Sequence, residues 1–212
     1  MRVLQTVLTG FLLLFVYSNS TQAAPVPSWS VNIQAGEYQP ISTAYAAEYG
    51  PGAFQGNLEL GYYITPRLQM GLSLGYFYGS GTVVSISGRL SALTQQLILV
   101  PTQIYIIYQF AFEENQVLVP YFGGGFTRVT YQHSVEGEDT AIGGMDGYHA
   151  RAGVKLLLNR FDPNNANNLY ADWRIIHTYF LLEGQYSRVN DFDNSSINLG
   201  GWSYFGGFQF EF

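Results

Sequence analysis

The sequence contains no cysteine, so disulfide bonds, thiol catalysis and cysteine-ligated metals are excluded. Charge is also scarce. Charged residues make up 11% of the chain, whereas an ordinary soluble domain contains about 25%. A soluble domain of this length normally carries more charge on its surface, and the shortage therefore favours a protein whose outer face meets lipid.

Long apolar runs are missing after residue 24. No stretch approaches the roughly 18 consecutive apolar residues of a transmembrane helix, which excludes a helical membrane protein. Basic residues are few as well, and the formal net charge is −6. A negatively charged chain is a poor partner for nucleic acid, because the phosphates require a basic surface.

Aromatic residues and glycine are abundant instead. The chain is 17% aromatic and contains 24 glycines. Little charge together with much tyrosine, phenylalanine and glycine is typical of a β-barrel that crosses a membrane. The outer face of such a barrel meets lipid, and its aromatic girdles lie at headgroup depth.

Residues 1–23 are predicted to be a secretory signal peptide. Arg2 precedes an apolar run that is too short to span a membrane, and small residues follow this run. Thr21 and Ala23 fit the small-residue positions of a signal cleavage site, so we expect the mature chain to enter the periplasm. No cysteine follows the cleavage point, so we expect no lipoprotein anchor. Residues 24–212 are expected to form one domain.

The end of the chain, residues 201–212, alternates strictly between two faces. A two-residue period predicts a β-strand. An apolar strand at the chain end needs partners for its face and for its edge, and a closed barrel in a membrane supplies both. The apolar face consists of Trp202, Tyr204, Gly206, Phe208, Phe210 and Phe212.

The same ending resembles the C-terminal sorting signal of bacterial outer-membrane proteins, a polar-x-Gly-x-x-aromatic-x-aromatic pattern. Gly207, Phe210 and Phe212 stand at the matching positions, and Phe208 adds a third aromatic residue. Phe205 departs from the pattern, which usually has a polar residue there. The resemblance implies that the barrel-insertion machinery reads these residues as an assembly signal.

Seven further segments alternate in the same way. The sequence therefore predicts an all-β fold, an up-and-down antiparallel transmembrane β-barrel of eight strands, in which the last strand closes against the first. A soluble secreted barrel of the lipocalin kind is the alternative, but its polar face would meet water and carry many charges. Here the polar phase is mostly Gln, Asn, Ser and Gly. The seven segments are residues 29–35, 54–64, 68–78, 96–110, 119–131, 148–159 and 178–188.

The links between the predicted strands differ in length. Those after the first, third and fifth strands are long, and those after the second and fourth are short. This is the asymmetry of external loops and periplasmic turns, so both termini are expected in the periplasm and the barrel in the outer membrane. The link at 161–173 is long for a turn, and we expect a short helix after Asp162-Pro163.

The strand predicted at 119–131 has an ambiguous facing. Phe122 and Phe126 favour one phase, but that phase also aims Arg128 at the lipid. We therefore expect the other phase to face outward. Its residues are Val119, Tyr121, Val129 and Tyr131.

The inward phases of the predicted strands carry five charged residues. An eight-stranded barrel is wide enough only for its own side chains, so charges buried in it must pair. Arg151 and Lys155 are expected to approach Glu183 on the neighbouring strand. Such a network resembles that of OmpA-like and OmpX-like barrels, in which it fills the lumen and, in OmpA, is proposed to contain a gate. Structural filling and a narrow ion path both remain open for Glu59, Arg151, Lys155, Glu183 and Glu211.

The apolar phase of the strand at 68–78 continues through Val84 and Leu90 into the strand at 96–110. The two strands are therefore expected to extend outside the membrane as one hairpin that turns near residues 87–89. Such a hairpin resembles that of OmpX and offers an edge to a surface partner by strand addition. A flexible serine-rich loop is the alternative.

No metal, cofactor or catalytic site is predicted. The segment 191–194 offers oxygen ligands but lacks the glycine and the glutamate of a calcium loop. His133, His149 and His177 are scattered. None of them begins the His-x-Ser pair that an outer-membrane lipid-A deacylase of the PagL kind uses on one strand face. An outer-membrane lipid-modifying enzyme therefore stays a minor alternative.

By resemblance, the whole predicted mature chain is similar to the small outer-membrane barrel superfamily that includes OmpA, OmpX and OmpW. The segment 119–125 matches the Pro-Tyr-x-x-x-Gly strands common there. We expect a monomeric, non-enzymatic protein in contact with outer-membrane lipid and lipopolysaccharide, with a structural or surface-contact role. A narrow channel or an OmpW-like conduit for small hydrophobic solutes is the rival. The conduit needs an apolar inner pocket, for which the candidates are Phe77, Leu97, Leu99, Tyr105 and Ile107.

Overall fold

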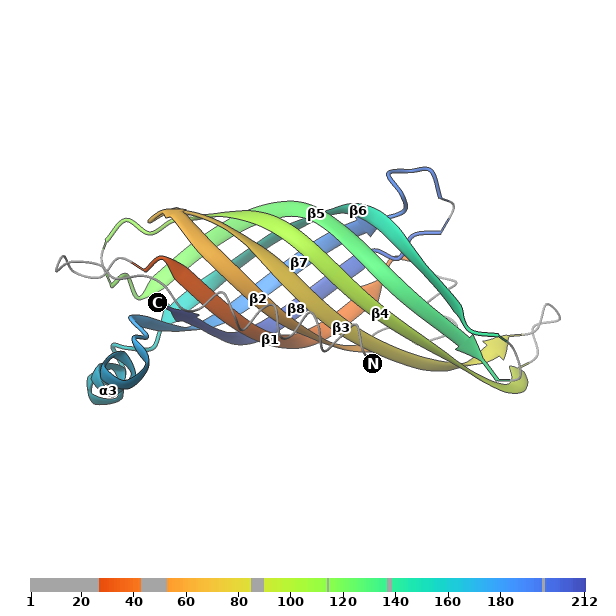
Figure 1. Ribbon diagram of the computed structural model, residues 1–212, viewed down its shortest axis with the longest axis horizontal. Coiled ribbons are helices and arrows are strands. Elements are labelled where there is room, and N and C mark those ends of the chain that lie inside the picture. The colour runs from red at the N-terminus through yellow and green to blue at the C-terminus, as the bar shows by residue number, and fades with distance from the viewer. Residues whose placement is uncertain (1–26, 43–52, 85–89, 114, 137–138, 196) are drawn as a thin grey trace.

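The computed structural model shows eight strands that pair in chain order and close into a barrel, because the last strand pairs with the first (Figure 1). It describes residues 27–42, 53–84, 90–113, 115–136, 139–195 and 197–212, and the predicted signal peptide at 1–23 lies outside these residues. The expected up-and-down antiparallel β-barrel is confirmed. Its strands are β1 (Trp29–Pro40), β2 (Ala53–Thr65), β3 (Leu68–Val84), β4 (Leu90–Gln109), β5 (Leu118–Val135), β6 (Ala141–Leu157), β7 (His177–Val189) and β8 (Gly201–Glu211).

The alternation along each strand separates the two faces of the wall. In β3, Gln69 and Ser73 are buried in the lumen, whereas Met70 and Leu72 face outward and are 43% and 44% exposed. Because successive side chains of a strand point to opposite faces, every second residue of the strand lies on the same face. The lumen is therefore lined mainly by polar side chains and the outer face mainly by apolar ones.

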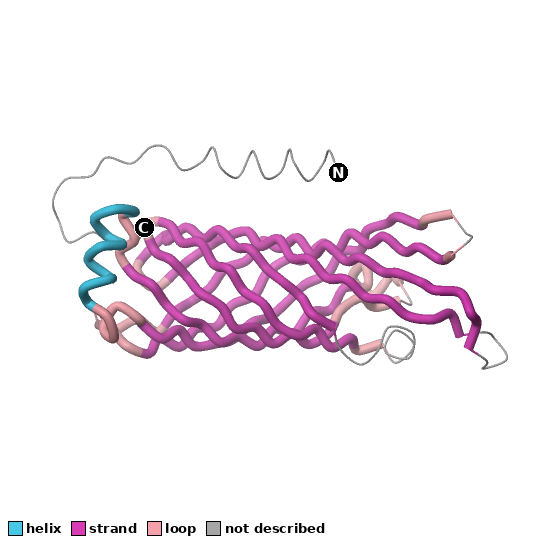
Figure 2. The backbone as a smooth tube through the Cα atoms, turned by 90° about the horizontal axis from the view of Figure 1, so that it is seen from below, coloured by secondary structure: helices cyan, strands magenta, loops and turns pink. Residues whose placement is uncertain are grey.

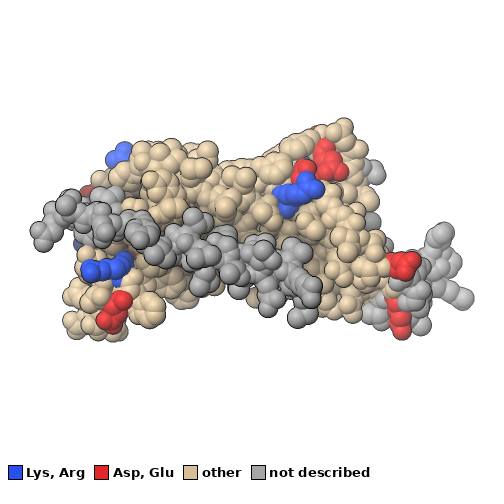
Figure 3. All heavy atoms as spheres, in the orientation of Figure 1, with Lys and Arg blue, Asp and Glu red and all other residues tan. Residues whose placement is uncertain are grey.

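Aromatic residues gather toward both ends of the outer face. Near the end that holds the C-terminus, the rings of Trp29 and Tyr62 lie 4.9 Å apart, and toward the opposite end those of Tyr186 and Trp202 lie 5.2 Å apart. On the face shown in Figure 3, the charged side chains gather at the two ends of the barrel, and the visible middle of the wall carries none. This is the surface pattern of a barrel wall that faces lipid.

The two ends of the chain close the barrel. β8 pairs with β1 along its whole length. The backbone N–H of Phe212 donates to the carbonyl oxygen of Trp29 at 2.8 Å, and the N–H of Ser28 donates to the carbonyl oxygen of Phe212 at 2.7 Å. The expected pairing of the last strand with residues 29–35 is confirmed, and it removes the open edge that an unpaired terminal strand would present.

Strands β3 to β6 extend beyond the other four at the end opposite the C-terminus (Figure 1). Pairing of β3 with β4 continues to Val84↔Leu90, and pairing of β5 with β6 continues to His133↔Ala141. The arms of the predicted hairpin are thereby confirmed, whereas its turn at 87–89 lies outside the described residues. The links after β3 and β5, expected to be long loops, are therefore largely strand. We call this extension the protruding sheet; it comprises residues 78–84, 90–98, 129–135 and 141–146.

The facing predicted for β5 was wrong. Phe122 lies on the outer face and is 52% exposed. The prediction gave too much weight to Arg128, which does face outward but pairs with Asp146 on β6 at 2.9 Å near the end of the barrel. An arginine near headgroup depth carries little of the cost that it has at the bilayer centre. The residues placed outward in error are Val119, Tyr121 and Val129, which are buried in the lumen, and Tyr131, which packs on a buried cluster there.

The long link after β6 contains the expected helix, α3 (Pro163–Trp173). The side chain of Asp162 caps its first turn by accepting a hydrogen bond from the N–H of Asn165 at 3.1 Å. The helix ends at Arg174, whose φ of 59° is left-handed. Figure 2 shows α3 beside the end of the barrel that holds the C-terminus, with its axis running across that of the barrel. The described residues contain no helix with the length and apolar character of a membrane span.

Deletion of Phe212 is expected to impair assembly, because it removes backbone partners of Ser28 and Trp29 together with the last residue of the predicted assembly signal. Since each lost hydrogen bond costs about 1 kcal/mol, we expect the folding equilibrium constant to fall at least about tenfold. The measurement is the faster gel migration of the unboiled barrel. Phe112→Ala changes an exposed aromatic residue outside the strands and should fold normally. Normal insertion of the deletion variant would contradict this prediction.

Candidate functional site

The centre of the lumen holds one arginine between two carboxylates. Nη1 of Arg151 on β6 lies 2.7 Å from Oε1 of Glu59 on β2 and 3.6 Å from Oε2 of Glu183 on β7. Nη2 of the same arginine donates to Oε1 of Gln103 at 2.7 Å. The three charged side chains are at most 1% exposed. Their pairing therefore takes place away from bulk water, where removal of one partner leaves an uncompensated charge.

Two tyrosines complete this central network. The ring centroid of Tyr105 lies 4.5 Å from Cζ of Arg151, and the hydroxyl of Tyr121 donates to Oε2 of Glu183 at 2.8 Å. Gly71 leaves room for the first ring, because a Cβ at this position would come within 2.5 Å of Tyr105. The missing side chain at Gly71 therefore permits the cation–π contact beneath the guanidinium.

A second network lies nearer the end of the barrel that holds the C-terminus. Nζ of Lys155 on β6 lies 3.4 Å from Oε1 of Glu211 on β8. The hydroxyl of Tyr63 donates to the same carboxylate oxygen at 2.5 Å. Nδ1 of His177 lies 3.0 Å from Oε2 of Glu211. The carboxylate of Glu211 on β8 therefore contacts side chains from β2, β6 and β7.

The prediction that both cations approach Glu183 holds for Arg151 and is wrong for Lys155. The register of β6 with β7 places Gly153 opposite Glu183, between the two cations. Lys155 forms its ion pair with Glu211 instead. Since β8 is not a hydrogen-bonded neighbour of β6, this pair crosses the lumen rather than joining adjacent strands. The five predicted lumen charges thus form two networks.

Little space remains between the side chains of the lumen. A cavity of about 30 Å³ lies on one side of the central network, and one of about 10 Å³, lined by Lys155 and Glu183, lies between the networks. Nine buried polar atoms of the described residues have no protein partner, among them Oε1 of Glu183 and Nε2 of His149. Cavities of this size admit one or two water molecules, which would satisfy such atoms. They do not admit a solute.

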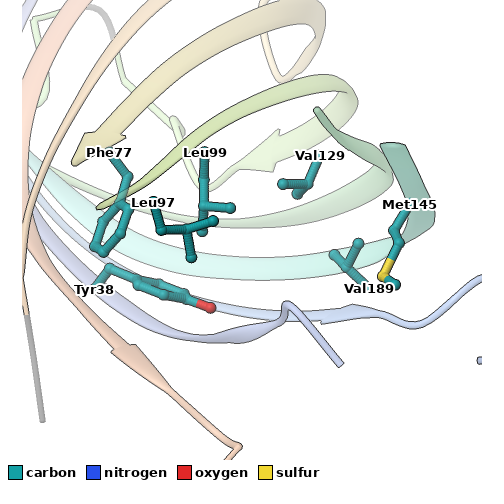
Figure 4. Close-up of a cluster of buried hydrophobic side chains, with 7 residues drawn as sticks. All are labelled: Tyr38, Phe77, Leu97, Leu99, Val129, Met145 and Val189. Atoms are coloured by element: carbon teal, nitrogen blue, oxygen red, sulfur yellow. The ribbon is translucent and has the colours of Figure 1, made fainter. Parts of the chain in front are cut away.

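The end of the lumen at the base of the protruding sheet is apolar. Seven buried side chains from the surrounding strands meet there (Figure 4). Of the five residues predicted to line an apolar pocket, three belong to this group, whereas Tyr105 and Ile107 pack with Tyr121 in a separate cluster. We call the group the mouth cluster; it consists of Tyr38, Phe77, Leu97, Leu99, Val129, Met145 and Val189.

Four members of the mouth cluster were not identified from the sequence. Val129 was assigned to the outer face, and Met145 lay outside the strand predicted at 148–159. The inward phase of β6 does continue back from His149 through Gly147 to Met145. That continued alternation could have placed Met145 in the lumen. The glycines around it obscured the pattern, because a glycine-rich stretch is typical of a loop.

The acidic segment 191–194 uses its oxygen atoms in contacts with β6 and within its own loop. Oδ1 of Asp191 accepts the N–H of Asp146 at 2.8 Å, and Oδ1 of Asp193 accepts the side-chain amide of Asn190 at 2.7 Å. The φ angles of Asp191 and Asp193 are 52° and 72°, so the loop is held by these contacts in a left-handed turn. Within the described part of the chain, no group of three or more His, Asp or Glu side chains is arranged to hold a metal ion.

The histidines lie apart from one another. Nδ1 of His149 is 2.7 Å from Oγ1 of Thr127 in the lumen, His177 contacts Glu211, and His133 lies on the protruding sheet. Through these hydrogen bonds, the described residues form no hydroxyl–imidazole–carboxylate chain of the kind that activates a nucleophile.

No protein-family model matches the chain, and no curated protein matches it. Solved structures do match. The outer membrane protein OprG from Pseudomonas aeruginosa superposes with a TM-score of 0.60 at 14% identity, over 91% of this chain and 99% of that one. The chain has the fold of the small outer-membrane β-barrels.

Two further structures support this assignment of the fold. Neisserial surface protein A gives a TM-score of 0.51 at 14% identity, over 87% of this chain and 97% of that one. Ail, the attachment invasion locus protein of Yersinia pestis, gives 0.51 at 10% identity over the same shares. These superpositions show a common fold, and identities this low leave the activity of the chain open.

Arg151→Met is expected to destabilise the barrel by about 3–5 kcal/mol, because it leaves Glu59 and Glu183 buried without their cation. Urea unfolding of the barrel refolded in vesicles measures this loss. Arg128→Met is the matched control. It removes an arginine that is 56% exposed in its pair with Asp146, and we expect a cost below about 1 kcal/mol.

Adding Glu59→Gln and Glu183→Gln to the Arg151→Met variant should restore most of the lost stability, because the uncompensated charges are removed. Equal stability of the Arg151→Met and Arg128→Met variants would show that the central network does not hold the barrel together.

Proposed function

We propose that the protein is a non-enzymatic, monomeric outer-membrane barrel that contacts a surface partner through its protruding sheet. The apolar outer wall supports a position in lipid, and the filled lumen argues against a diffusion pore, which needs about 16 strands. The barrel-insertion machinery and outer-membrane lipid, including lipopolysaccharide, are its assembly partners in this proposal. The similar proteins include one named for attachment.

The proposed orientation of the barrel in the membrane follows from the different lengths of the segments at its two ends. The protruding sheet lies opposite the C-terminus (Figure 1), and extracellular segments of such barrels are longer than periplasmic ones. The protruding sheet is therefore assigned to the outside. Both ends of the mature chain are then periplasmic, as is helix α3.

The observation that carries the surface role is an edge of the protruding sheet. Pairing of β3 with β2 ends at Phe77↔Gln55, while its pairing with β4 continues to Val84↔Leu90. On its other side, the segment 78–84 pairs with no strand among the described residues. Such an edge presents backbone donors and acceptors to which an extended peptide can add as a further strand.

Shortening the hairpin is expected to remove binding by strand addition. In the test variant an Asn-Gly turn replaces residues 82–94, so that the arms end at the existing pair Gly81↔Gln95. The probe is a synthetic peptide that copies residues 90–98, the segment that already pairs with β3. We expect its affinity for the vesicle-embedded barrel to fall more than about tenfold, since at least two hydrogen bonds of about 1 kcal/mol each are lost.

A matched control peptide is N-methylated at alternate residues, so that its amides cannot donate to the strand edge. It should bind the unaltered barrel as weakly as the parent peptide binds the shortened variant. Equal binding of both peptides, or of one peptide to both proteins, would contradict strand addition. Unchanged gel migration of the variant shows that its barrel is intact.

The mouth cluster favours a second candidate function, an entry path for small apolar solutes. Its seven side chains form an apolar interior surface at the end assigned to the outside, and apolar pockets are where such molecules bind. In this candidate function, the side chains of the mouth cluster move apart to admit a solute, since the cavity of about 30 Å³ that several of them line holds only water. The solute then leaves through the wall, because the polar networks block the lumen below.

Leu97→Asn is expected to slow octane entry into vesicles at least about fivefold, because octane that passes the cluster must displace water from the new amide, which costs about 1–3 kcal/mol. Ile142→Asn, at a position that is 72% exposed, is the matched control and should leave entry unchanged. Entry at the rate of protein-free vesicles would rule out the path. A steady ionic conductance in planar bilayers, abolished by Glu183→Ala or Lys155→Ala, would instead favour the narrow channel.

A further inference from the structure

Helix α3 has one apolar face and one polar face. Ala166, Leu169, Tyr170 and Trp173 follow the spacing that brings residues onto one side of a helix. The opposite side carries asparagines, one aspartate and Ala171. None of the helix residues is buried, and Trp173 is 70% exposed. An apolar stripe of this kind on a helix indicates a surface that the barrel itself does not cover.

The helix lies where a membrane surface would meet it. Figures 1 and 2 show α3 at the end of the barrel that holds the C-terminus, beyond the ends of the strands and outside the outline of the wall in Figure 1. In Figure 2 its axis runs across the barrel axis, and in Figure 1 the helix is seen nearly along its own axis. Since a barrel axis follows the membrane normal to a first approximation, α3 lies in the plane of the membrane.

The segments that flank α3 combine arginine with aromatic residues. Phe161, just before the helix, is 69% exposed. Arg160 and Arg174 bracket the helix, and Cζ of Arg174 lies 5.7 Å from the ring centroid of Tyr170. Aromatic rings and arginines are the residues that anchor a segment at headgroup depth, where the rings lie among the glycerol groups and the guanidinium groups meet phosphates.

A second arginine–aromatic pair lies at the same end of the barrel. Cζ of Arg67, in the turn after β2, lies 5.0 Å from the ring centroid of Phe112, which is 65% exposed. The outer wall above is apolar, and the rings of Phe180 and Phe208 lie 5.7 Å apart on β7 and β8. The wall proposed to face lipid therefore carries aromatic residues at the same end of the barrel as α3.

We propose that α3 is an interfacial helix that rests on the periplasmic leaflet of the membrane that the barrel spans. Trp173, Tyr170 and Phe161 lie among the lipid headgroups, and Arg160 and Arg174 pair with phosphates of anionic phospholipids. The polar asparagine face meets the periplasm. This inference rests on the proposed membrane position of the barrel, and it adds a lipid contact outside the barrel wall.

Depth-dependent fluorescence quenching tests the proposal. The chain contains three tryptophans, so Trp29→Phe with Trp202→Phe leaves Trp173 as the single reporter. The full barrel is refolded in phosphatidylglycerol vesicles that contain lipids brominated either near the headgroup or near the chain end. We expect the shallow bromines to quench Trp173 more strongly than the deep ones, and acrylamide in the water to quench it weakly.

The matched control retains Trp202, on the aromatic band of the barrel wall, with Trp29→Phe and Trp173→Phe. Quenching of Trp202 by brominated lipid without quenching of Trp173 would overturn the interfacial helix while leaving the barrel in its membrane. If neither tryptophan is quenched, the membrane position itself is wrong. Protection of Trp173 from acrylamide only after addition of a periplasmic extract would identify a protein as the occupant and would also overturn the proposal.

The arginines provide a second arm of the test. In the Trp173 reporter, Arg160→Gln with Arg174→Gln is expected to weaken the lipid contact of the helix by more than about fivefold, because each cation near an anionic surface contributes about 1 kcal/mol. The measure is the ratio of shallow to aqueous quenching. Phosphatidylcholine vesicles should reduce this ratio for the parent reporter and leave the double variant unchanged. Equal ratios for both proteins in both lipids would contradict the phosphate contact.

Discussion

Backbone hydrogen bonding around the closed wall is the constraint on which the rest of this structure depends. In a hydrocarbon environment, N–H and C=O groups find no water, so each strand needs a partner on both sides. The last strand supplies this partner to the first along its whole length, and the contact reaches the final residue, Phe212. The number of strands that close in this way also determines the width of the interior.

That width explains the chemistry of the lumen. Eight strands enclose a space that their own side chains fill, so a charge placed there must find an opposite charge rather than water. Arg151 meets this condition with carboxylates from β2 and β7, and Lys155 with a carboxylate from β8. Two of these ion pairs, Arg151–Glu59 and Lys155–Glu211, thereby connect strands that do not share backbone hydrogen bonds. The same filling that stabilises the barrel leaves the mouth cluster and the outer surfaces as the places where another molecule can bind.

The local pattern of the chain predicted much of this architecture. Alternation identified all eight strands, the closure by residues 201–212 and the inward position of the five charges, because a period of two residues is a local property. It failed where the pattern weakens. Strand β6 begins at Ala141, seven positions before the predicted start at 148, since glycines obscure the alternation there. In β5, both faces carry large apolar residues, so the period alone did not identify the outer face.

By itself, the sequence determined the class of fold, the residues that line the lumen on most strands and the helix that follows Asp162. Only the tertiary structure decided which charges meet. Arg151 and Lys155 stand four positions apart on one strand, yet one pairs with Glu59 and Glu183 and the other with Glu211. The tilt and stagger of the strands set which side chains face each other across a closed barrel. The spacing of residues along one strand does not determine this tilt and stagger, so it could not predict which charges pair.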